Sequence, residues 1–370
     1  MVMNSIELRR EIHKHPELSF EEHNTQRLII EALQSEGIEC RAIAGTGVLA
    51  KIEGNRGNHR RCVVLRADID ALPIKELNDI EYCSENEGVM HACGHDIHTA
   101  ILFGVLQRLK QHPDFEGTLF GIFQPGEELN PGGASLVLKE QPFEGYDVAA
   151  VIGQHVDASF EVGEVAICPG VFMASNDELR FWVRGKGGHA ARRSSIDDTV
   201  TAMADMVMRT TALNSPNGVV SIGKVIADGA TNVIPDCVSA EGTMRTFDGE
   251  ERERIYKHIY SNAKAIEQKY GVAVEVDINR GYPSVKNDIM LAYEAMIIAQ
   301  DENIKVCDIA RIPMAEDFGF YTELYPSLFY RLGVGSDAGG SHSATFLPDE
   351  AAIAVGERMM CRMALHILNK

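Results

Sequence analysis

Residues 62–70 read CVVLRADID, and this stretch decides the fold of the chain. Its first six residues are mainly apolar and predict a buried strand, and Asp68 and Asp70 follow directly. Similar short runs alternate with helical stretches along much of the chain: we expect strands at 118–124, 148–153 and 328–332 and helices at 97–109 and 349–369. Strands that alternate with helices predict a layered α/β domain with a largely parallel sheet.

The middle of the chain has a different order of predicted strands and helices. Its hydrophobic pattern predicts the order β-α-β-β-α-β, with strands at 178–184, 219–227, 237–247 and 272–280 and helices at 196–213 and 249–270. This order is that of a ferredoxin-like unit. Because the unit begins and ends inside the chain, we predict an inserted domain at 177–284. The α/β domain is then discontinuous and is formed by residues 1–176 and 285–370.

Composition excludes several classes of protein. Of the 370 residues, 45% are hydrophobic and 24% charged, which is typical of a globular protein rather than a disordered one. Acidic residues number 54 against 35 basic ones, so the formal net charge is −19. A surface this acidic repels nucleic acids and anionic membranes. No apolar run approaches the roughly 20 residues of a membrane span. The eight cysteines form no CxxC pair and no apolar leader follows Met1, which favours the cytoplasm.

Reactive residues follow three of the predicted strands. Asp68 and Asp70 come after the first, Glu127 and Glu128 come shortly after strand 118–124, and His155 comes two residues beyond strand 148–153. Ligands of open α/β sheets bind beyond the carboxyl ends of the strands. We therefore expect these side chains to converge on one crevice.

The motif MHACGHDIH at residues 90–98 opens a predicted helix. Cys93 and His95 lie on either side of Gly94, which permits a tight turn of the backbone. A thiolate and an imidazole this close are typical ligands of first-row transition metals. Asp96 is either a helix cap or the partner of a ligating imidazole.

Glu127 and Glu128 are adjacent carboxylates, which repel each other unless a cation or a proton lies between them. A division of labour in which one Glu binds metal and the other takes a proton from water suits hydrolysis. His342, in the segment GSHS at 340–343, adds an imidazole from the far end of the chain.

The inserted domain carries GKGGHA at residues 185–190, which lacks the spacing of a phosphate-binding Walker loop. His189 on this glycine loop is suited to donate a hydrogen bond to a developing oxyanion. Asn232 is suited to bind an amide or carbonyl, and Arg245 to bind a carboxylate.

In this order the motifs resemble those of the dinuclear metallopeptidase family that contains aminoacylases, carboxypeptidase G-like enzymes, hippurate hydrolases, auxin-conjugate hydrolases and N-acetyl-diaminopimelate deacetylases. The resemblance runs nearly end to end, through segments 10–17, 66–73, 91–98, 127–128, 186–190, 232–235, 316–318 and His342. Other branches of the family carry His-x-Asp where this chain has Asp68-Ile69-Asp70, so Cys93 and His95 must supply more of the metal site.

The resemblance implies a catalytic α/β domain with two divalent metal ions and a ferredoxin-like lid that often mediates dimers. It implies five metal ligands: Cys93, His95, Glu128, His155 and His342. It also implies that Glu127 is the general base and that Asp70 supports the site electrostatically. His189 and Asn232 would reach the site from the lid. A thiolate among imidazoles and carboxylates accepts zinc, and also manganese, cobalt or nickel.

The sequence therefore predicts a metal-dependent amidohydrolase that cleaves the amide bond of small N-acyl amino acids. A dipeptidase or carboxypeptidase of the same family and an N-acetyl-diaminopimelate deacetylase are the alternatives within this chemistry. A binding protein that has lost catalysis is the alternative outside it, and the presence of Glu127 beside every expected ligand argues against it.

Overall fold

The computed structural model describes residues 3–370 and divides into two compact units. The first unit contains the chain up to Gly170 together with Val285–Ala310 and Asp317–Lys370. The second contains Val171–Ser284 and Arg311–Glu316. Each unit has its own hydrophobic core.

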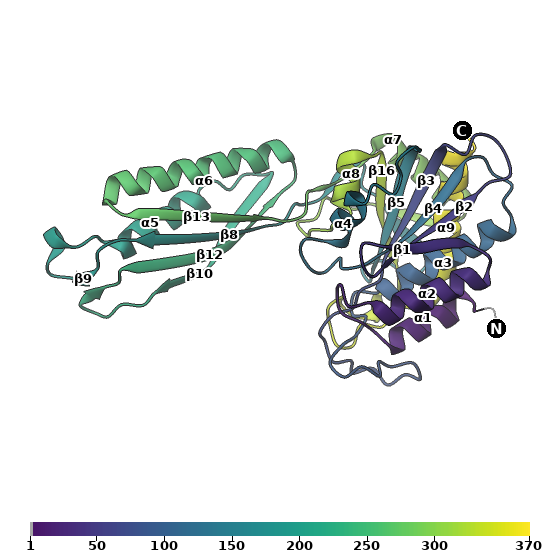
Figure 1. The fold of residues 1–370 in the computed structure, drawn as a ribbon, viewed down its shortest axis with the longest axis horizontal. Helices are drawn as coiled ribbons and strands as arrows, with labels where there is room; N and C mark the ends of the chain where they lie inside the picture. Colours follow the sequence, from purple (N-terminus) through teal and green to yellow (C-terminus); the bar gives the residue numbers. More distant parts are fainter. Residues whose placement is uncertain (1–2) are drawn as a thin grey trace. The chain divides into compact units, whose positions relative to one another are not determined.

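An eight-stranded sheet forms the centre of the first unit (Figure 1). Its strands lie in the order β1 (Glu39–Ile43), β2 (Gly47–Glu53), β4 (Thr118–Gln124), β3 (Arg61–Asp68), β5 (Asp147–Asp157), β16 (Ser327–Gly333), β6 (Glu164–Ala166) and β15 (Lys305–Cys307). The four central strands, β4, β3, β5 and β16, run parallel. Strands β1 and β2 join antiparallel at one edge, and β6 lies antiparallel to β16. The predicted α/β fold is confirmed, with a mixed sheet.

Helices cover both faces of this sheet. On one face α1 (Ser5–Lys14), α3 (His95–Gln111) and α9 (Ala351–Leu368) pack together. On the other, α8 (Gly319–Leu324) lies beside α4 (Gly133–Lys139). Successive side chains of β16 point to opposite faces of the sheet and so contact both helix layers. Leu328 and Tyr330 join the main core, while Phe329 stacks on Phe318 at the start of α8. The remaining elements of the unit are α2 (His23–Ser35), β14 (Val285–Asn287), α7 (Ile289–Asp301) and a 3₁₀ turn at Ser336–Ala338.

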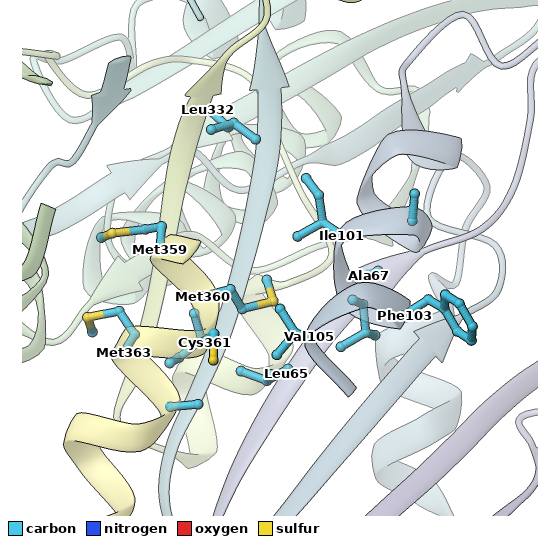
Figure 2. Close-up of a cluster of buried hydrophobic side chains, with 14 of the residues drawn as sticks. Leu65, Ala67, Ile101, Phe103, Val105, Leu332, Met359, Met360, Cys361 and Met363 are labelled. Carbon is cyan, nitrogen blue, oxygen red and sulfur yellow. The ribbon is translucent and has the colours of Figure 1, made fainter. Parts of the chain in front are cut away.

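The main core lies between α3, α9 and the sheet. Figure 2 shows Met360 of α9 on the side facing Val105 of α3 and Leu65 of β3. Helix α9 approaches α3 closely at Gly356, where a Cβ would lie 2.5 Å from Ile101. This packing fixes the N-terminal end of α3, which carries the metal-ligand motif.

The second unit is a four-stranded antiparallel sheet with two helices. The strands lie in the order β10 (Gly218–Ala227), β12 (Cys237–Thr246), β8 (Asp177–Arg184) and β13 (Ala273–Arg280). Helices α5 (Thr199–Thr211) and α6 (Gly249–Tyr270) pack on the sheet and on each other, so both cover the same face (Figure 1). Short elements complete the description: β7 (Gly170–Met173), β9 (Gly188–His189), β11 (Val233–Ile234) and a 3₁₀ turn at Arg193–Ser195.

Strand β5 differs from its predicted bounds, since it continues to Asp157 rather than ending at Gly153. Its last residues stay paired with β16, and Arg331 is the partner of His155. His155 therefore lies within the strand and not beyond it. The hydrophobic pattern does not predict this extension, because Gln154 and His155 are polar.

Candidate metal centre

The N-terminus of α3 places two of the predicted ligands. Gly94 adopts the left-handed conformation, with φ at +84°, and begins the helix between Cys93 and His95. A Cβ at this position would lie 2.5 Å from the side chain of Val156, so both the turn and the close approach require glycine. Cys93 and His95 are both buried.

The predicted ligands converge from β5, α3 and three loops. The Sγ atom of Cys93 lies 3.3 Å from Nε2 of His155. Ligand atoms lie within 4.8 Å of one another in each of three overlapping groups, which are Cys93–His95–His155, Cys93–Glu128–His342 and His95–Glu127–Glu128. The structure thus brings together all five predicted ligands and Glu127. A thiol, three imidazoles and carboxylates are donors that a divalent metal ion binds.

Asp70 orients the ring of His95. The Nδ1 atom of His95 lies 3.1 Å from Oδ1 of Asp70 and 3.0 Å from its backbone oxygen. Both atoms are acceptors, so in the neutral ring, the form that binds metal, Nδ1 carries the proton and Nε2 keeps a lone pair. This Nε2 is buried and has no hydrogen-bond partner among the described residues. It is therefore oriented to bind a cation.

Burial sets the charge states of the neighbouring ligands. It raises the pKa of the Cys93 thiol to about 12 and holds the pKa of His155 well below its usual value. His155 is consequently neutral, as a metal ligand must be. Cys93 needs a nearby cation to stabilise its thiolate.

Glu128 and His342 form the more exposed part of the cluster. Their side chains meet at 3.1 Å, and the hydrogen bond to Glu128 is the main cause that raises the pKa of His342. His342 has a φ of +63°, which is uncommon for a residue other than glycine. Its backbone N–H donates to the carbonyl of Ala92 at 2.7 Å, and this bond ties the loop to the motif before α3.

A buried ion network behind the ligands was missed by the sequence analysis. The guanidinium of Arg66 binds Asp68 at 2.6 Å and Asp317 at 2.7 Å, and all three side chains are fully buried. Gln124 at the end of β4 also donates to Asp317. Burial alone would raise the pKa of Asp68, but Arg66 and two histidines hold it well below its usual value. Asp68 lies two residues after Arg66 on the same face of β3, but Asp317 and Gln124 lie far away in sequence, so β3 alone gives no sign of them.

Asp96 has neither of the two roles considered for it. It makes no side-chain cap of α3, and its carboxylate lies 2.7 Å from Nε of Arg9 and 2.8 Å from Nδ1 of His13. Neither partner belongs to the ligand cluster. Asp96 instead attaches the start of α3 to α1 through a buried ion pair.

The predicted substrate-binding residues all lie in the second unit. His189 in β9 pairs with Val233 of β11, and the N–H of Ala190 donates to the carbonyl of Asn232 at 2.9 Å. His189 and Asn232 are exposed, and Arg245 on β12 is half-buried. His189 and Asn232 thus lie close to each other, and the roles of all three residues stay predictions.

A mixed α/β fold with a buried cluster of thiol, imidazole and carboxylate donors defines a protein that binds a divalent metal ion. Residues 64–366 match the sequence profile of Peptidase family M20/M25/M40. The chain belongs to this family, and it is a hydrolase that acts on amide bonds.

Three similar proteins illustrate the match. An N-acetyldiaminopimelate deacetylase of Exiguobacterium sibiricum is 37% identical, over 94% of this chain and 95% of its own length. An N-acetylcysteine deacetylase of Bacillus subtilis is 36% identical, over 98% of this chain and 97% of its own. The crystal structure of a dinuclear metal binding peptidase of the M20 family from Bacillus subtilis superposes with a TM-score of 0.88 at 34% identity, covering 98% of this chain and 97% of that one.

Proposed function

We propose that this protein is a metal-dependent amidohydrolase that cleaves the amide bond of small N-acyl amino acids. The observation that carries the proposal is the convergence of Cys93, His95, His155, Glu128 and His342 around Glu127. Relatives that are named as deacetylases of N-acetylated amino acids support the same reaction class.

The residues fit two divalent cations. Two donor groups, Cys93–His95–His155 and Cys93–Glu128–His342, share Cys93, so two neighbouring ions can each have three protein donors. Nε2 of His95, which is buried and makes no hydrogen bond with the described residues, and the neutral ring of His155 suit such ions. The donor set suits zinc, and manganese, cobalt or nickel as well. When bound, such ions supply Lewis-acid polarisation of a carbonyl and lower the pKa of water.

Glu127 is the general base of the proposed reaction. Its carboxylate is buried and lies in a group with His95 and Glu128. Glu127 takes a proton from the water that attacks the acyl carbonyl carbon, and a tetrahedral oxyanion forms. It then gives the proton to the leaving nitrogen as the C–N bond breaks, which releases a carboxylic acid and a free amine. Asp70 keeps His95 oriented throughout.

The second unit is proposed to act as a ferredoxin-like lid. Its element order and its sheet order β10-β12-β8-β13 support this assignment. His189 would donate to the oxyanion, Asn232 would bind the acyl or amide group, and Arg245 would bind the substrate carboxylate. Strand β10 is an edge strand with exposed Val219 and Val225, which supports dimerisation through this unit.

The cytoplasm is the proposed location of the protein. Among residues 3–370, no helix is both long and apolar enough to cross a membrane. All eight cysteines are free thiols, as expected in a reducing compartment. The proposed substrate is a small molecule, with no role for nucleic acid or a membrane.

A substrate panel tests the proposed function. The enzyme, reconstituted with zinc, manganese, cobalt or nickel, is offered N-acetyl, N-benzoyl and longer N-acyl amino acids, and free amine is measured. N-acetylcysteine and N-acetyldiaminopimelate are included because the relatives are named for them. Dipeptides are offered in the same panel, and turnover of dipeptides alone would instead support a dipeptidase. Absence of turnover with every substrate and metal would contradict the proposal.

A further inference from the structure

His98 lies on α3 beside the ligand cluster, is fully buried, and has a partner on each ring nitrogen. The backbone N–H of Val156 donates to its Nε2 at 2.9 Å. A nitrogen that accepts a hydrogen bond carries the lone pair, so the ring proton of neutral His98 is on Nδ1. Nδ1 lies 2.5 Å from Oδ1 of Asp68 and donates to it. The tautomer of His98 is fixed by these two bonds.

The backbone of Val156 also holds His155, through its carbonyl group. The carbonyl oxygen of Val156 accepts from Nδ1 of His155 at 2.7 Å. This bond leaves the lone pair of His155 on Nε2, the atom that lies 3.3 Å from the sulfur of Cys93. The backbone of Val156 therefore connects the two imidazoles, because its N–H donates to His98 and its C=O accepts from His155.

We propose that His98 is a positioning residue that fixes His155 in its metal-binding orientation by way of the backbone of Val156. The chain of contacts starts at Asp317, which binds Arg66, and continues through Asp68 to His98. The proposal rests on the proposed function in one respect, namely that His155 is a metal ligand. Partners that orient a ligating histidine commonly affect metal affinity nearly as much as a ligand does.

Direct metal binding by His98 is the competing interpretation. Asp68, His95 and His98 do place ligand atoms within 4.8 Å of one another. However, Val156 occupies the lone pair of His98 Nε2, and Asp68 occupies Nδ1. His98 would have to give up one of these buried bonds in order to bind an ion. The Val156 N–H or the Asp68 carboxylate would then lose its hydrogen bond to His98.

Two substitutions separate the contacts of His98. In His98→Gln the amide oxygen can replace Nε2 as acceptor for the Val156 N–H. In His98→Asn the amide nitrogen can replace Nδ1 as donor to Asp68, but the Val156 N–H loses its acceptor. Affinity for cobalt(II) is measured by competition with a chelator, and the cobalt–thiolate absorption of Cys93 is recorded. We expect His98→Asn to weaken affinity about 10–100-fold and to change the spectrum, and His98→Gln to stay within about threefold of the parent.

Thr99→Val is the matched control. Thr99 lies on α3 next to His98, and the substitution removes its buried hydrogen bond to the backbone oxygen of Asp68. It should lower the melting temperature without changing the cobalt affinity or spectrum. Parent-like affinity in folded His98→Asn would overturn the proposal, as would a loss in His98→Gln as large as in His98→Asn. If a variant fails to fold, ring-¹⁵N histidine NMR of the metal-loaded parent decides, since a proton on Nε2 of His98 would also overturn it.

His155→Ala separates this inference from the proposed function. Unchanged cobalt affinity in His155→Ala would show that His155 is not a ligand, and both proposals would fail. Weakened affinity in His155→Ala together with parent-like His98→Asn would leave the proposed function intact and reject only the role of His98.

Discussion

The Nε2 atom of His342 lies 3.1 Å from Oε1 of Glu128, and the two residues come from distant parts of the chain. The bond ties the loop after β16 to the loop after β4. His342 holds this position with a left-handed backbone, a conformation that side chains other than glycine adopt at a cost. Such a cost at a cluster of metal-binding groups supports the assignment of His342 as a ligand.

Substitution of His342 tests that assignment. We expect His342→Ala to lower the content of tightly bound metal and to reduce kcat by at least about 100-fold, because one metal loses a donor. Metal per chain is measured by elemental analysis after gel filtration. His366→Ala, at an exposed histidine of α9, is the control and should keep both values. Full metal content and turnover in His342→Ala would contradict the assignment.

Glu127 and Glu128 should give opposite results although they are neighbours. We expect Glu127→Gln to keep its metal and to lose turnover by about 10²–10⁴-fold, because it removes the general base. Glu128→Gln should lose metal as well as activity, because it removes a ligand. Metal content and kcat are measured for both variants on the same N-acyl substrate. Near-normal turnover in Glu127→Gln would refute its role as base.

Asp70 should control metal affinity without binding metal itself. Its carboxylate accepts from Nδ1 of His95, from the hydroxyl of Ser19 at 2.7 Å and from the N–H of Glu128 at 3.0 Å. Asp70→Asn should weaken metal binding about 10–100-fold, measured by chelator competition. Ser19→Ala removes one of the same bonds and leaves His95 oriented, so its effect should be smaller. Equal effects of the two variants would argue against orientation of His95 as the role of Asp70.

Metal removal should lower stability as well as activity. A bound ion stabilises the fold by about 2.7 kcal/mol when its concentration is 100 times its Kd. We therefore expect treatment with a chelator to lower the melting temperature and abolish turnover, and added zinc or manganese to restore both. Cys93→Ser should resemble the chelated protein, whereas Cys83→Ser, at a half-buried free thiol, should not. A melting temperature that stays unchanged when the chelator is added would contradict a buried metal centre.

The central strands and the candidate site residues could be predicted from the sequence for the same reason. β4 is buried along its whole length and β3 from Cys62 onward, so both strands are mainly apolar runs, and reactive residues follow them closely. Parallel strands then bring those residues to one edge of the sheet. This rule and the spacing of Cys93 and His95 around Gly94 indicate candidate residues, whereas the set of five ligands is what the resemblance to the metallopeptidase family implies.

The contacts between buried polar side chains could not be predicted from the sequence in this way. Arg66 in β3 lies among apolar neighbours, and only the packing of the sheet brings Asp317 to it. His98 belongs to a motif rich in ligands, yet Val156 and Asp68 occupy its nitrogens. The edge strand β1 is largely exposed and carries little apolar periodicity. These features depend on neighbours that local sequence does not specify.

Glu76 should make stability depend on pH below about 4.5. Burial alone would raise the pKa of Glu76, but hydrogen bonds from His13, from the N–H of Ser84 and from Asn78 lower it from 4.5 to about 2. A carboxylate with a lowered folded pKa stabilises the fold above its unfolded pKa, and this stability is lost as the pH falls from about 4.5 to about 2. Its partner His13 behaves oppositely: its pKa is raised, so its contribution is complete below 6.5 and is lost as the pH rises through the raised value.

Glu76→Gln tests this dependence. The variant should be less stable than the parent by about 2 kcal/mol near pH 6, where a charge-assisted bond to His13 is lost, and the difference should shrink as the pH approaches 2. Urea unfolding at several pH values measures it. Glu87→Gln is the control, because Glu87 is highly exposed and lies 3.6 Å from Lys75, a surface pair that contributes little. A difference between Glu76→Gln and the parent that stays constant from pH 6 to pH 2 would show that the ionised carboxylate is not what stabilises this part of the fold.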